Sequence, residues 1–468
     1  RRKSWLILAQ ASLGAILIVL STLDPKSALG WFSLLAGFGA FASATQDIVI
    51  DAWRVDVADE IATLDLLSTV YQFGYRIASL AGGALALVLA ARIGWPNVYM
   101  VFGFAMLGVL LITFFAPDTP RPVGGEDEQT ELRSPGAVHP RIRGFALAAV
   151  GSLWAWALIT VGVFMVRSLT AEPELRPNPT EFIQFYGPLI IVATVIIPTI
   201  IAAWLETKRA NGQYVMTETI PATSGLGRTL DHGYAALILP LGEIAVRLRW
   251  ASVLVLALIL SYRITDSIWG PFAYPFYLGE LGYTNDEVAL ASKFFGVGMT
   301  MLGIALSAFL FASIGRMATV VLGAIIAAAS NLLYADLAAG GGGLDIFGTY
   351  SGFYQLVGLF GADERLARLM LAISGENIAG GIAGAAFIAY LSAITSKKYS
   401  AVQYALLSSL TFLVGSLGRA ALGEGIERIG YESIFYITAA IGVVAVILAF
   451  LELLRERANN YRTVAQPA

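Results

Sequence analysis

The chain has 468 residues, of which 57% are hydrophobic and only 13% are charged, and its mean hydropathy is +0.72. Soluble domains carry roughly 25% charged residues, so this composition predicts an integral membrane protein. The net charge of −3 offers no basic face for nucleic acid. Because the chain has no cysteine, disulfides, thiolate metal sites and a cysteine nucleophile are excluded.

Uncharged or nearly uncharged runs of about 18 to 25 residues predict about twelve membrane-spanning helices. These runs lie near residues 4–22, 29–50, 64–91, 96–116, 144–166, 184–205, 250–279, 286–313, 316–338, 366–394, 399–421 and 431–454. Lysine and arginine gather at the start of the chain, in the loops between spans four and five and between spans six and seven, and in the tail. Since positive residues mark cytoplasmic loops, we expect both termini in the cytoplasm.

The spans form groups of four, two and six, separated by polar loops. The last six predict a six-helix bundle, and the first four predict an equivalent bundle lacking its first two helices, which makes the chain read as the continuation of something longer. Two such bundles are the architecture of major facilitator transporters. The predicted parts are an N-terminal bundle remnant at 1–116, a cytoplasmic loop at 117–143, a two-helix insert at 144–205, a cytoplasmic loop with an amphipathic helix at 206–249, the C-terminal bundle at 250–455 and a cytoplasmic tail at 456–468.

Two connections between spans carry their own signals. The stretch 234–250 alternates leucine and isoleucine with charged residues, which predicts an amphipathic helix at the membrane interface. The connection 339–365 is rich in glycine, tyrosine and phenylalanine, and we expect an external loop lying on the membrane surface. Short basic turns precede equivalent spans of the two bundles, at Arg1-Arg2-Lys3 and at Ile314-Gly315-Arg316.

The most polar helix face lies at the end of the second span. On a helix, Asp47, Asp51 and Arg54 stand at i, i+4 and i+7 and therefore share a face, with Gln46 beside Asp47. Ionisable groups inside a membrane are costly, so they usually mark a substrate or ion path. The alternative is that the helix ends near Asp47 and that the charges lie among lipid headgroups.

Further polar residues lie in the spans that correspond to helices seven and ten of the two-bundle architecture. By analogy, these helices line its central cavity together with helices one and four. Span 250–279 holds Tyr262, Arg263, Asp266 and Trp269, and span 366–394 holds Glu376 and Asn377. Arg263 and Asp266 are alternatively a structural ion pair. A membrane glutamate must be protonated, paired or hydrated, which makes Glu376 a proton-site candidate.

Polar residues in other spans complete the predicted cavity: Tyr71, Gln72, Tyr75, Arg76, Lys293 and Gln403. A cavity with amides, aromatic rings and charges of both signs suits a large polar ligand with sugar rings and carboxylates. The glycines at 380, 381 and 384 indicate close helix packing.

The sequence also excludes several chemistries. Only two histidines occur, His139 and His232, both in polar loops, so any proton carrier should be a carboxylate. No Gly-x-x-x-x-Gly-Lys-Ser/Thr phosphate loop appears, so the chain has no ATP site of its own to drive transport. Neither a metal motif nor a serine hydrolase motif appears within the spans. We therefore expect no catalytic residues, no metal site and no cofactor.

The order of several motifs resembles the AmpG-type muropeptide permeases of the major facilitator superfamily. The motifs are Ser43-Ala-Thr-Gln-Asp-Ile-Val-Ile-Asp-Ala-Trp-Arg54, Gly74-Tyr-Arg76, Tyr262 with Asp266, Glu376-Asn377 with Gly380-Gly381, and Tyr399-Ser-Ala-Val-Gln403. Two extra central spans are also similar to that family. The missing first two helices and a long external loop at 339–365 depart from its pattern.

The resemblance implies a proton symporter that imports anhydro-muropeptides across the bacterial inner membrane for peptidoglycan recycling and, in some bacteria, for β-lactamase induction. It implies a monomer in the lipid bilayer with a small-molecule substrate. Asp47, Asp266 or Glu376 would carry the proton, whereas the remaining polar residues, Asp51 included, would bind substrate. Alternatives are a transporter of another polar metabolite, such as acetyl-CoA or an exported drug, and a polytopic membrane enzyme of wall or lipid metabolism.

Overall fold

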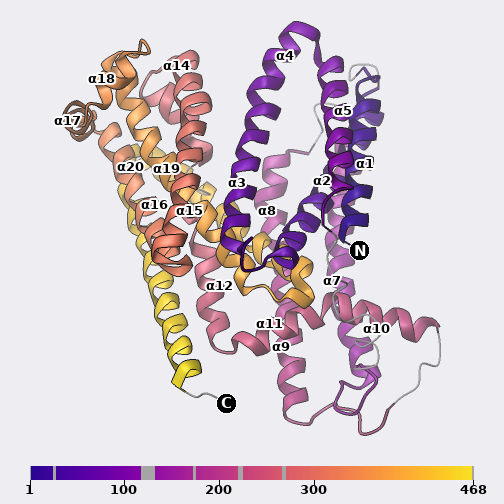
Figure 1. Cartoon of the computed structure of the whole chain (residues 1–468). Helices are drawn as coiled ribbons and strands as arrows, with labels where there is room; N and C mark the ends of the chain where they lie inside the picture. Colours follow the sequence, from indigo (N-terminus) through magenta and orange to yellow (C-terminus); the bar gives the residue numbers. More distant parts are fainter. Residues whose placement is uncertain are drawn as a thin grey trace. The chain divides into compact units, whose positions relative to one another are not determined.

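The computed structural model describes residues 2–24, 28–117, 132–171, 175, 177–219, 225–265 and 270–465 (Figure 1). Within these ranges the chain is built of helices, and the extended backbone forms one isolated bridge, between Val138 and Val215. Ten of the described helices are long and apolar enough to cross a membrane, or eleven if one bent helix pair is counted as a span. The expected all-α, multi-pass membrane protein is therefore confirmed.

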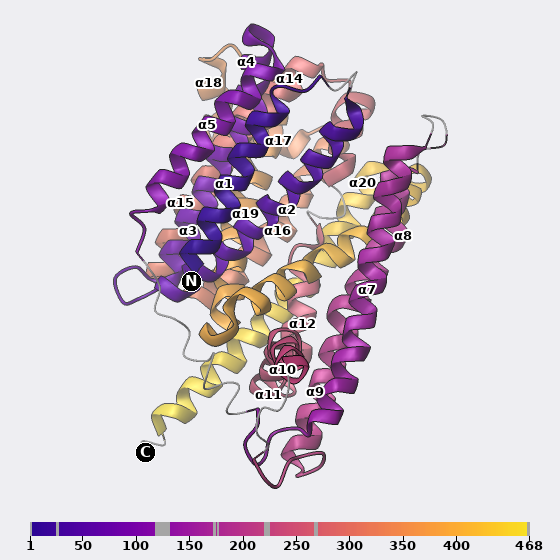
Figure 2. The ribbon, with the colours of Figure 1, turned by 90° about the vertical axis from the view of Figure 1, so that its right-hand side faces the viewer.

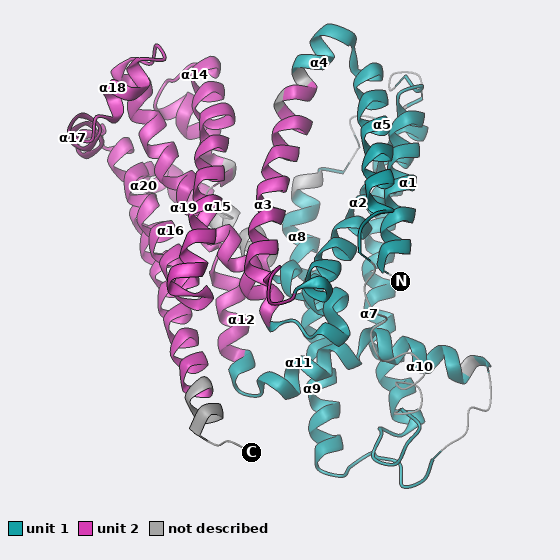
Figure 3. Ribbon diagram, in the orientation of Figure 1, with its two compact units in different colours: residues 1–58, 87–252, 394–410 teal, residues 59–86, 253–393, 411–468 magenta. Residues whose placement is uncertain are grey.

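The described chain divides into two compact units (Figure 3). Unit 1 comprises residues 1–58, 87–252 and 394–410, and unit 2 comprises residues 59–86, 253–393 and 411–468. Unit 1 contains α1 (Arg2–Leu20), α2 (Leu29–Val57), most of α4 (Ala86–Ile93), α5 (Trp95–Thr113), α7 (Pro140–Thr170), α8 (Pro179–Ile191), α9 (Ile197–Ala210), α10 (Gly225–Leu237) and α11 (Leu239–Leu248).

Helices α1, α2 and α5 of unit 1 pack closely because small residues meet where they cross. A Cβ atom added to Gly103 of α5 would lie 2.7 Å from the Ile18 side chain and 3.1 Å from the carbonyl oxygen of Gly14 on α1. Without hydrophobic expulsion between helices in lipid, such close backbone approach supplies much of the attraction. Helix α1 therefore contacts both of its neighbours along its length.

The two-helix insert forms a second packed group within unit 1. Helix α7 runs beside the helix that α8 and α9 build, which is continuous through a π-helical turn at Val192–Ile196 (Figure 2). Helices α10 and α11 pack on the same ends, and their buried core includes Leu205, Tyr234 and Ile238. The chain bends by 110° between α11 and α12 (Ala251–Ser261), as expected for an interfacial helix that leads into a span.

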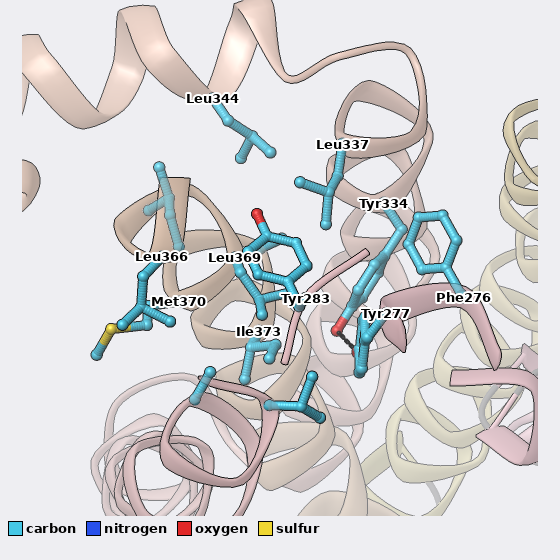
Figure 4. Close-up of a cluster of buried hydrophobic side chains, with 14 of the residues drawn as sticks. Phe276, Tyr277, Tyr283, Tyr334, Leu337, Leu344, Leu366, Leu369, Met370 and Ile373 are labelled. Atoms are coloured by element: carbon cyan, nitrogen blue, oxygen red, sulfur yellow. Dashed lines mark hydrogen bonds between the residues drawn. The ribbon is translucent and has the colours of Figure 1, made fainter. Parts of the chain in front are cut away.

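Unit 2 holds the remaining helices. These are α3 (Leu64–Leu80), most of α12, α14 (Asn285–Ala289), α15 (Gly296–Ile314), α16 (Arg316–Ala338), α17 (Gly342–Tyr350), α18 (Phe353–Gly358), α19 (Glu364–Ile394) and most of α20 (Ser400–Ala465). Its core is aromatic, with Phe276, Tyr277 and Tyr334 fully buried or nearly so (Figure 4). The centre of the Phe435 ring lies 5.1 Å from the centre of the Phe276 ring and 5.4 Å from the centre of the Tyr334 ring.

Three details differ from simple uninterrupted spans. Helix α12 ends at Ser261, and further on the structure describes helical turns at Gly270–Phe272 and Pro275–Glu280. The last two predicted spans are merged in α20 and separated by Gly430, whose φ of 79° only glycine adopts readily. The connection 339–365, expected as an external loop, contains two short helices, α17 and α18.

Candidate functional site

The polar face of α2 lies inside one unbroken helix. Because α2 continues to Val57, the alternative that the helix ends near Asp47 is wrong. Arg54 lies 3.3 Å from Asp51, and its guanidinium carbon is 5.5 Å from the centre of the Tyr404 ring. The Arg54 side chain is 3% exposed, so this ion pair is part of the packed interior of unit 1.

The other two predicted residues of α2 are more accessible. Asp47 is exposed and Gln46 is half-buried. The Gln46 side-chain oxygen is buried and has no hydrogen-bond partner among the described residues. A buried amide oxygen without a partner is costly, and a ligand hydroxyl or amide would satisfy it. The geometry of α2 therefore favours Gln46 and Asp47 over Asp51 for contact with a transported molecule.

Residues at the end of α2 form a polar cluster that the sequence analysis did not include in the site. Arg2 donates to Asp56 at 2.9 Å and to the Ser400 hydroxyl at 2.8 Å, and Ser400 donates to Asp56 at 3.1 Å. Unit 2 carries a comparable pair, since Arg316 donates to Asp65 at 2.6 Å. Arg2 and Arg316 belong to the short basic turns that precede equivalent spans in the sequence. These ion pairs join residues at the ends of helices.

In unit 2, Glu376 of α19 meets hydroxyl groups. The Tyr334 hydroxyl of α16 donates to the Glu376 carboxylate, and the hydroxyls of Tyr334 and Tyr277 lie 2.8 Å apart (Figure 4). Tyr334 is fully buried and Tyr277 is 3% exposed. A hydroxyl donates to an ionised carboxylate and accepts from a protonated one, so this chain of hydroxyls accommodates either state of Glu376. Neither tyrosine was singled out from the sequence.

Asn377, the residue after Glu376, connects two helices. Its side-chain oxygen accepts a 2.7 Å hydrogen bond from Thr300 of α15. The two helices touch through glycine, since a Cβ atom on Gly381 would lie 2.4 Å from the Thr300 carbonyl oxygen. The predicted close packing is thus confirmed for Gly381 but wrong for Gly380, where a Cβ atom would meet nothing within 4 Å.

Gln72 and Arg263 come together at a third glycine of α19. A Cβ atom on Gly384 would lie 3.0 Å from the Gln72 side-chain nitrogen and 3.4 Å from an Arg263 guanidinium nitrogen. The missing side chain therefore makes room for an amide and a guanidinium. These are the donor types that bind sugar hydroxyls and carboxylates. On the same helix as Gln72, the Arg76 guanidinium carbon lies 5.9 Å from the centre of the Tyr75 ring.

Other predicted binding residues have packing roles in this structure. Tyr262 is 3% exposed, stacks on Phe387 at 4.9 Å and donates to the Val320 carbonyl oxygen at 2.9 Å. Gln403 is fully buried; it donates to the Pro240 carbonyl oxygen and the Glu243 carboxylate, and accepts from the Ser396 amide. The contacts of these two side chains leave little room for a ligand.

Two of the remaining predicted residues are described, and two are not. Lys293 places its ammonium nitrogen 5.3 Å from the centre of the Tyr274 ring, and Tyr71 is half-buried on α3. Asp266 and Trp269 lie outside the described residues. Their predicted roles, like those of the other site residues, stay predictions.

A polar cluster outside the spans joins α17, α18 and α19. Arg368 donates to Asp345 at 2.5 Å and 2.8 Å, and the Tyr354 hydroxyl donates to it at 2.7 Å. The hydrogen bonds from Arg368 are the main cause that lowers the pKa of the Asp345 carboxyl below its usual value. This cluster holds the connection together and contains no residue of the predicted site. The described ranges include no group of three histidine or carboxylate side chains that could hold a metal ion.

Comparison with known proteins gives a consistent picture along the whole chain. No protein-family model matches. The anhydromuropeptide permease of Escherichia coli K12 is 25% identical over all of this chain and 70% of its own length. Two proteins named putative transporter AmpG, from Rickettsia conorii and Rickettsia typhi, are 23% and 24% identical over 96% of this chain and 78% and 81% of their own lengths.

A solved structure supports the fold. The human organic anion transporter MFSD10 (TETRAN) superposes with a TM-score of 0.53 over 96% of this chain and 77% of its own, at 11% sequence identity. At that identity the likeness concerns the fold alone. The chain is thus similar in sequence to named permeases and in fold to a major facilitator transporter.

Proposed function

Because the chain is a transporter, similar throughout to the AmpG-type permeases, we propose that it imports anhydro-muropeptides together with protons. The substrate would be the disaccharide of N-acetylglucosamine and anhydro-N-acetylmuramic acid, with or without its peptide. The protein would lie in a bacterial inner membrane with both termini in the cytoplasm, act as a monomer without a cofactor, and serve peptidoglycan recycling. In some bacteria it would thereby also contribute to β-lactamase induction.

The observation that carries the proton coupling is the contact between Glu376 and the Tyr334 hydroxyl inside unit 2. A coupling group must take up and release a proton within each transport cycle. The Glu376 carboxylate meets a hydroxyl that serves as donor or acceptor, so both states keep a hydrogen bond. Asp51, in contrast, forms an ion pair with Arg54 of its own helix, at 3.3 Å. Asp47 and Asp266 remain the other proposed proton carriers.

Substrate recognition would use the polar residues predicted from the sequence. Arg76 and Arg263 would bind the lactyl or peptide carboxylates, because a guanidinium forms two parallel hydrogen bonds with a carboxylate. Gln46, Gln72 and Asn377 would bind hydroxyl and amide groups of the sugars. The aromatic residues would stack on sugar rings. Alternating access would then expose these groups to one side of the membrane at a time.

The proposal is tested by uptake in bacteria that lack their own permease. Cells expressing the full-length protein are given radiolabelled anhydro-disaccharide tripeptide, with and without an uncoupler. We expect uptake that disappears when the uncoupler is added. Absence of uptake by correctly inserted protein would contradict the substrate, and acetyl-CoA and exported compounds would be tried next. Uptake that is unaffected by the uncoupler would contradict proton coupling alone.

A further inference from the structure

Unit 1 contains a pocket that the proposed transport function does not use. Its volume is about 550 Å³, and it lies where the loop 132–138 meets the ends of α9 and α10, helix α11 and the turn at 398–399. Apart from the end of α9, these segments belong to loops that the positive-inside rule places in the cytoplasm. We call this cavity the loop pocket.

Three cationic side chains line the loop pocket. Arg209, Arg247 and Lys398 line it together with two carboxylates, Glu206 and Glu243. The carboxylates are already engaged, since Arg209 lies 3.2 Å from Glu206 and Arg247 lies 2.7 Å from Glu243. The lining therefore carries one more positive than negative charge, and its carboxylates are largely neutralised by neighbouring guanidinium groups.

Apolar and aromatic side chains also line the loop pocket. It is lined by Leu132, Val138, Leu239, Val246, Tyr234 and Tyr399. Apolar and aromatic side chains contact the uncharged part of an organic ligand, while charged groups fix its orientation. The volume falls within the roughly 300–1,000 Å³ range of small-molecule sites.

The loop pocket is held open by well-defined contacts. A Cβ atom on Gly242 would lie 3.0 Å from the Glu206 side chain, so α11 approaches α9 as closely as glycine allows. Gln403 donates to the Pro240 carbonyl oxygen at 2.8 Å and to Glu243 at 2.6 Å. These contacts hold Glu206 and Glu243, two residues of the pocket lining, in place before any ligand binds, and this lowers the entropic cost of binding.

We propose that the loop pocket binds an amphipathic organic phosphate. Phosphate oxygens would interact with Arg209, Arg247 and Lys398, because guanidinium and ammonium groups form short, charge-assisted hydrogen bonds with phosphate. The uncharged part of the ligand would contact the apolar and aromatic side chains of the lining. The phosphate comes from one of two sources, a soluble metabolite or the headgroup of an anionic phospholipid.

An occupant of this pocket would act on the turn between α19 and α20. Arg247 also donates to the carbonyl oxygen of Ile394, the last residue of α19, at 2.6 Å. Ser400, directly after Tyr399, bonds to Asp56 and Arg2. A phosphate that draws Arg247 or Lys398 toward itself would alter the contacts of this turn. We therefore expect ligand binding to change the transport rate as well as stability.

Binding is measured with the full-length protein purified in a phosphate-free detergent. The soluble probe is adenosine 5′-monophosphate, with adenosine as the probe that lacks phosphate, and the readout is calorimetry. In the second arm, bound lipid is counted by native mass spectrometry after the protein is offered phosphatidylglycerol or phosphatidylcholine. The test variant combines Arg209→Gln with Lys398→Gln. The control is Lys208→Gln, which removes one positive charge from a residue that lies over the Trp204 ring and outside the pocket lining, and it is matched in charge by the single variant Lys398→Gln.

We expect binding of the nucleotide but not of adenosine, or retention of phosphatidylglycerol over phosphatidylcholine, and about a tenfold or greater loss in the double variant. The control should bind like the unmodified protein. The first result identifies a soluble ligand and the second a lipid. Absence of both, equal loss in the control, or equal binding by the double variant would overturn the proposal. If the double variant does not fold, Lys398→Gln alone gives the same comparison, since this side chain is exposed.

Discussion

The two compact units hold intramembrane carboxylates in different surroundings. In unit 1, Asp51 lies 3.3 Å from Arg54, and both belong to one turn of α2. In unit 2, Glu376 accepts from the Tyr334 hydroxyl, which comes from a different helix. Asp51 thus has a cationic partner on its own helix, whereas the partner of Glu376 is a hydroxyl, which can hydrogen-bond to either form of a carboxyl. This difference is why we propose Glu376 as the proton carrier.

The largest expected effect follows from replacing Glu376 by Gln. The amide keeps the shape and hydrogen-bonding capacity of the protonated acid but cannot release a proton. We expect net uptake to fall to the level of cells without the protein, while exchange of labelled for unlabelled substrate continues. Glu364→Gln is the matched control, because Glu364 is exposed at the start of the same helix. Unchanged net uptake by the Glu376 variant would remove it from the candidates.

Replacing Tyr334 by Phe removes the hydroxyl and leaves the ring packing intact. Loss of a hydrogen bond to a charged group costs about 1.5–3 kcal/mol, so we expect a lower melting temperature and uptake reduced about tenfold. Tyr436→Phe provides the comparison, since that side chain is 51% exposed. If both variants transport equally well, the hydroxyl chain has no role in coupling.

Substitutions at two adjacent glycines of α19 test its close packing against α15. Gly381→Ala should destabilise unit 2 by about 1–3 kcal/mol, because the new methyl group overlaps the backbone of α15. Gly380→Ala should be neutral or slightly stabilising, since the added methyl group meets open space. Thermal melting of the two purified variants measures the difference. Equal melting temperatures would show that α15 and α19 are not in close contact.

The smallest expected effect concerns Asp345, outside the spans. Its pKa is lowered in the folded protein, mainly by Arg368, so its stabilisation is present above the unfolded pKa and is lost as pH falls through the folded pKa. Asp345→Asn should lower the stability by less than about 1 kcal/mol at pH 7, since the carboxyl is 38% exposed and screened by solvent. Melting curves of the variant and the unmodified protein should converge only at a pH below the lowered pKa that Asp345 has in the folded protein. A difference that persists there would point to packing instead.

The sequence predicted the architecture better than the contacts of individual residues. Long apolar runs and basic loops are local signals, and the described helices follow them closely. Glu376 was identifiable because a charge in an apolar span is conspicuous. Tyr334 was not, since a single tyrosine in such a span looks like a core residue. Its role depends on the approach of α16 to α19, which no local pattern encodes.

Gln403 shows that the contacts of a single side chain cannot be read from the sequence. A glutamine in a span suggests a ligand contact, but this one is fully buried and binds Pro240 and Glu243 of α11. The sequence identified both the interfacial helix and the glutamine, and it could not show that they meet across some 160 residues of chain. For the same reason, the loop pocket, which is built from five separate segments, could not be foreseen.

The most direct test of proton-coupled muropeptide transport is the movement of protons with substrate. The purified protein is reconstituted into liposomes that enclose a pH-sensitive dye, and anhydro-disaccharide tripeptide is added outside without any imposed gradient. Our account predicts acidification of the interior that depends on substrate and is absent from the Glu376→Gln variant. Substrate entry with no change of internal pH would contradict it.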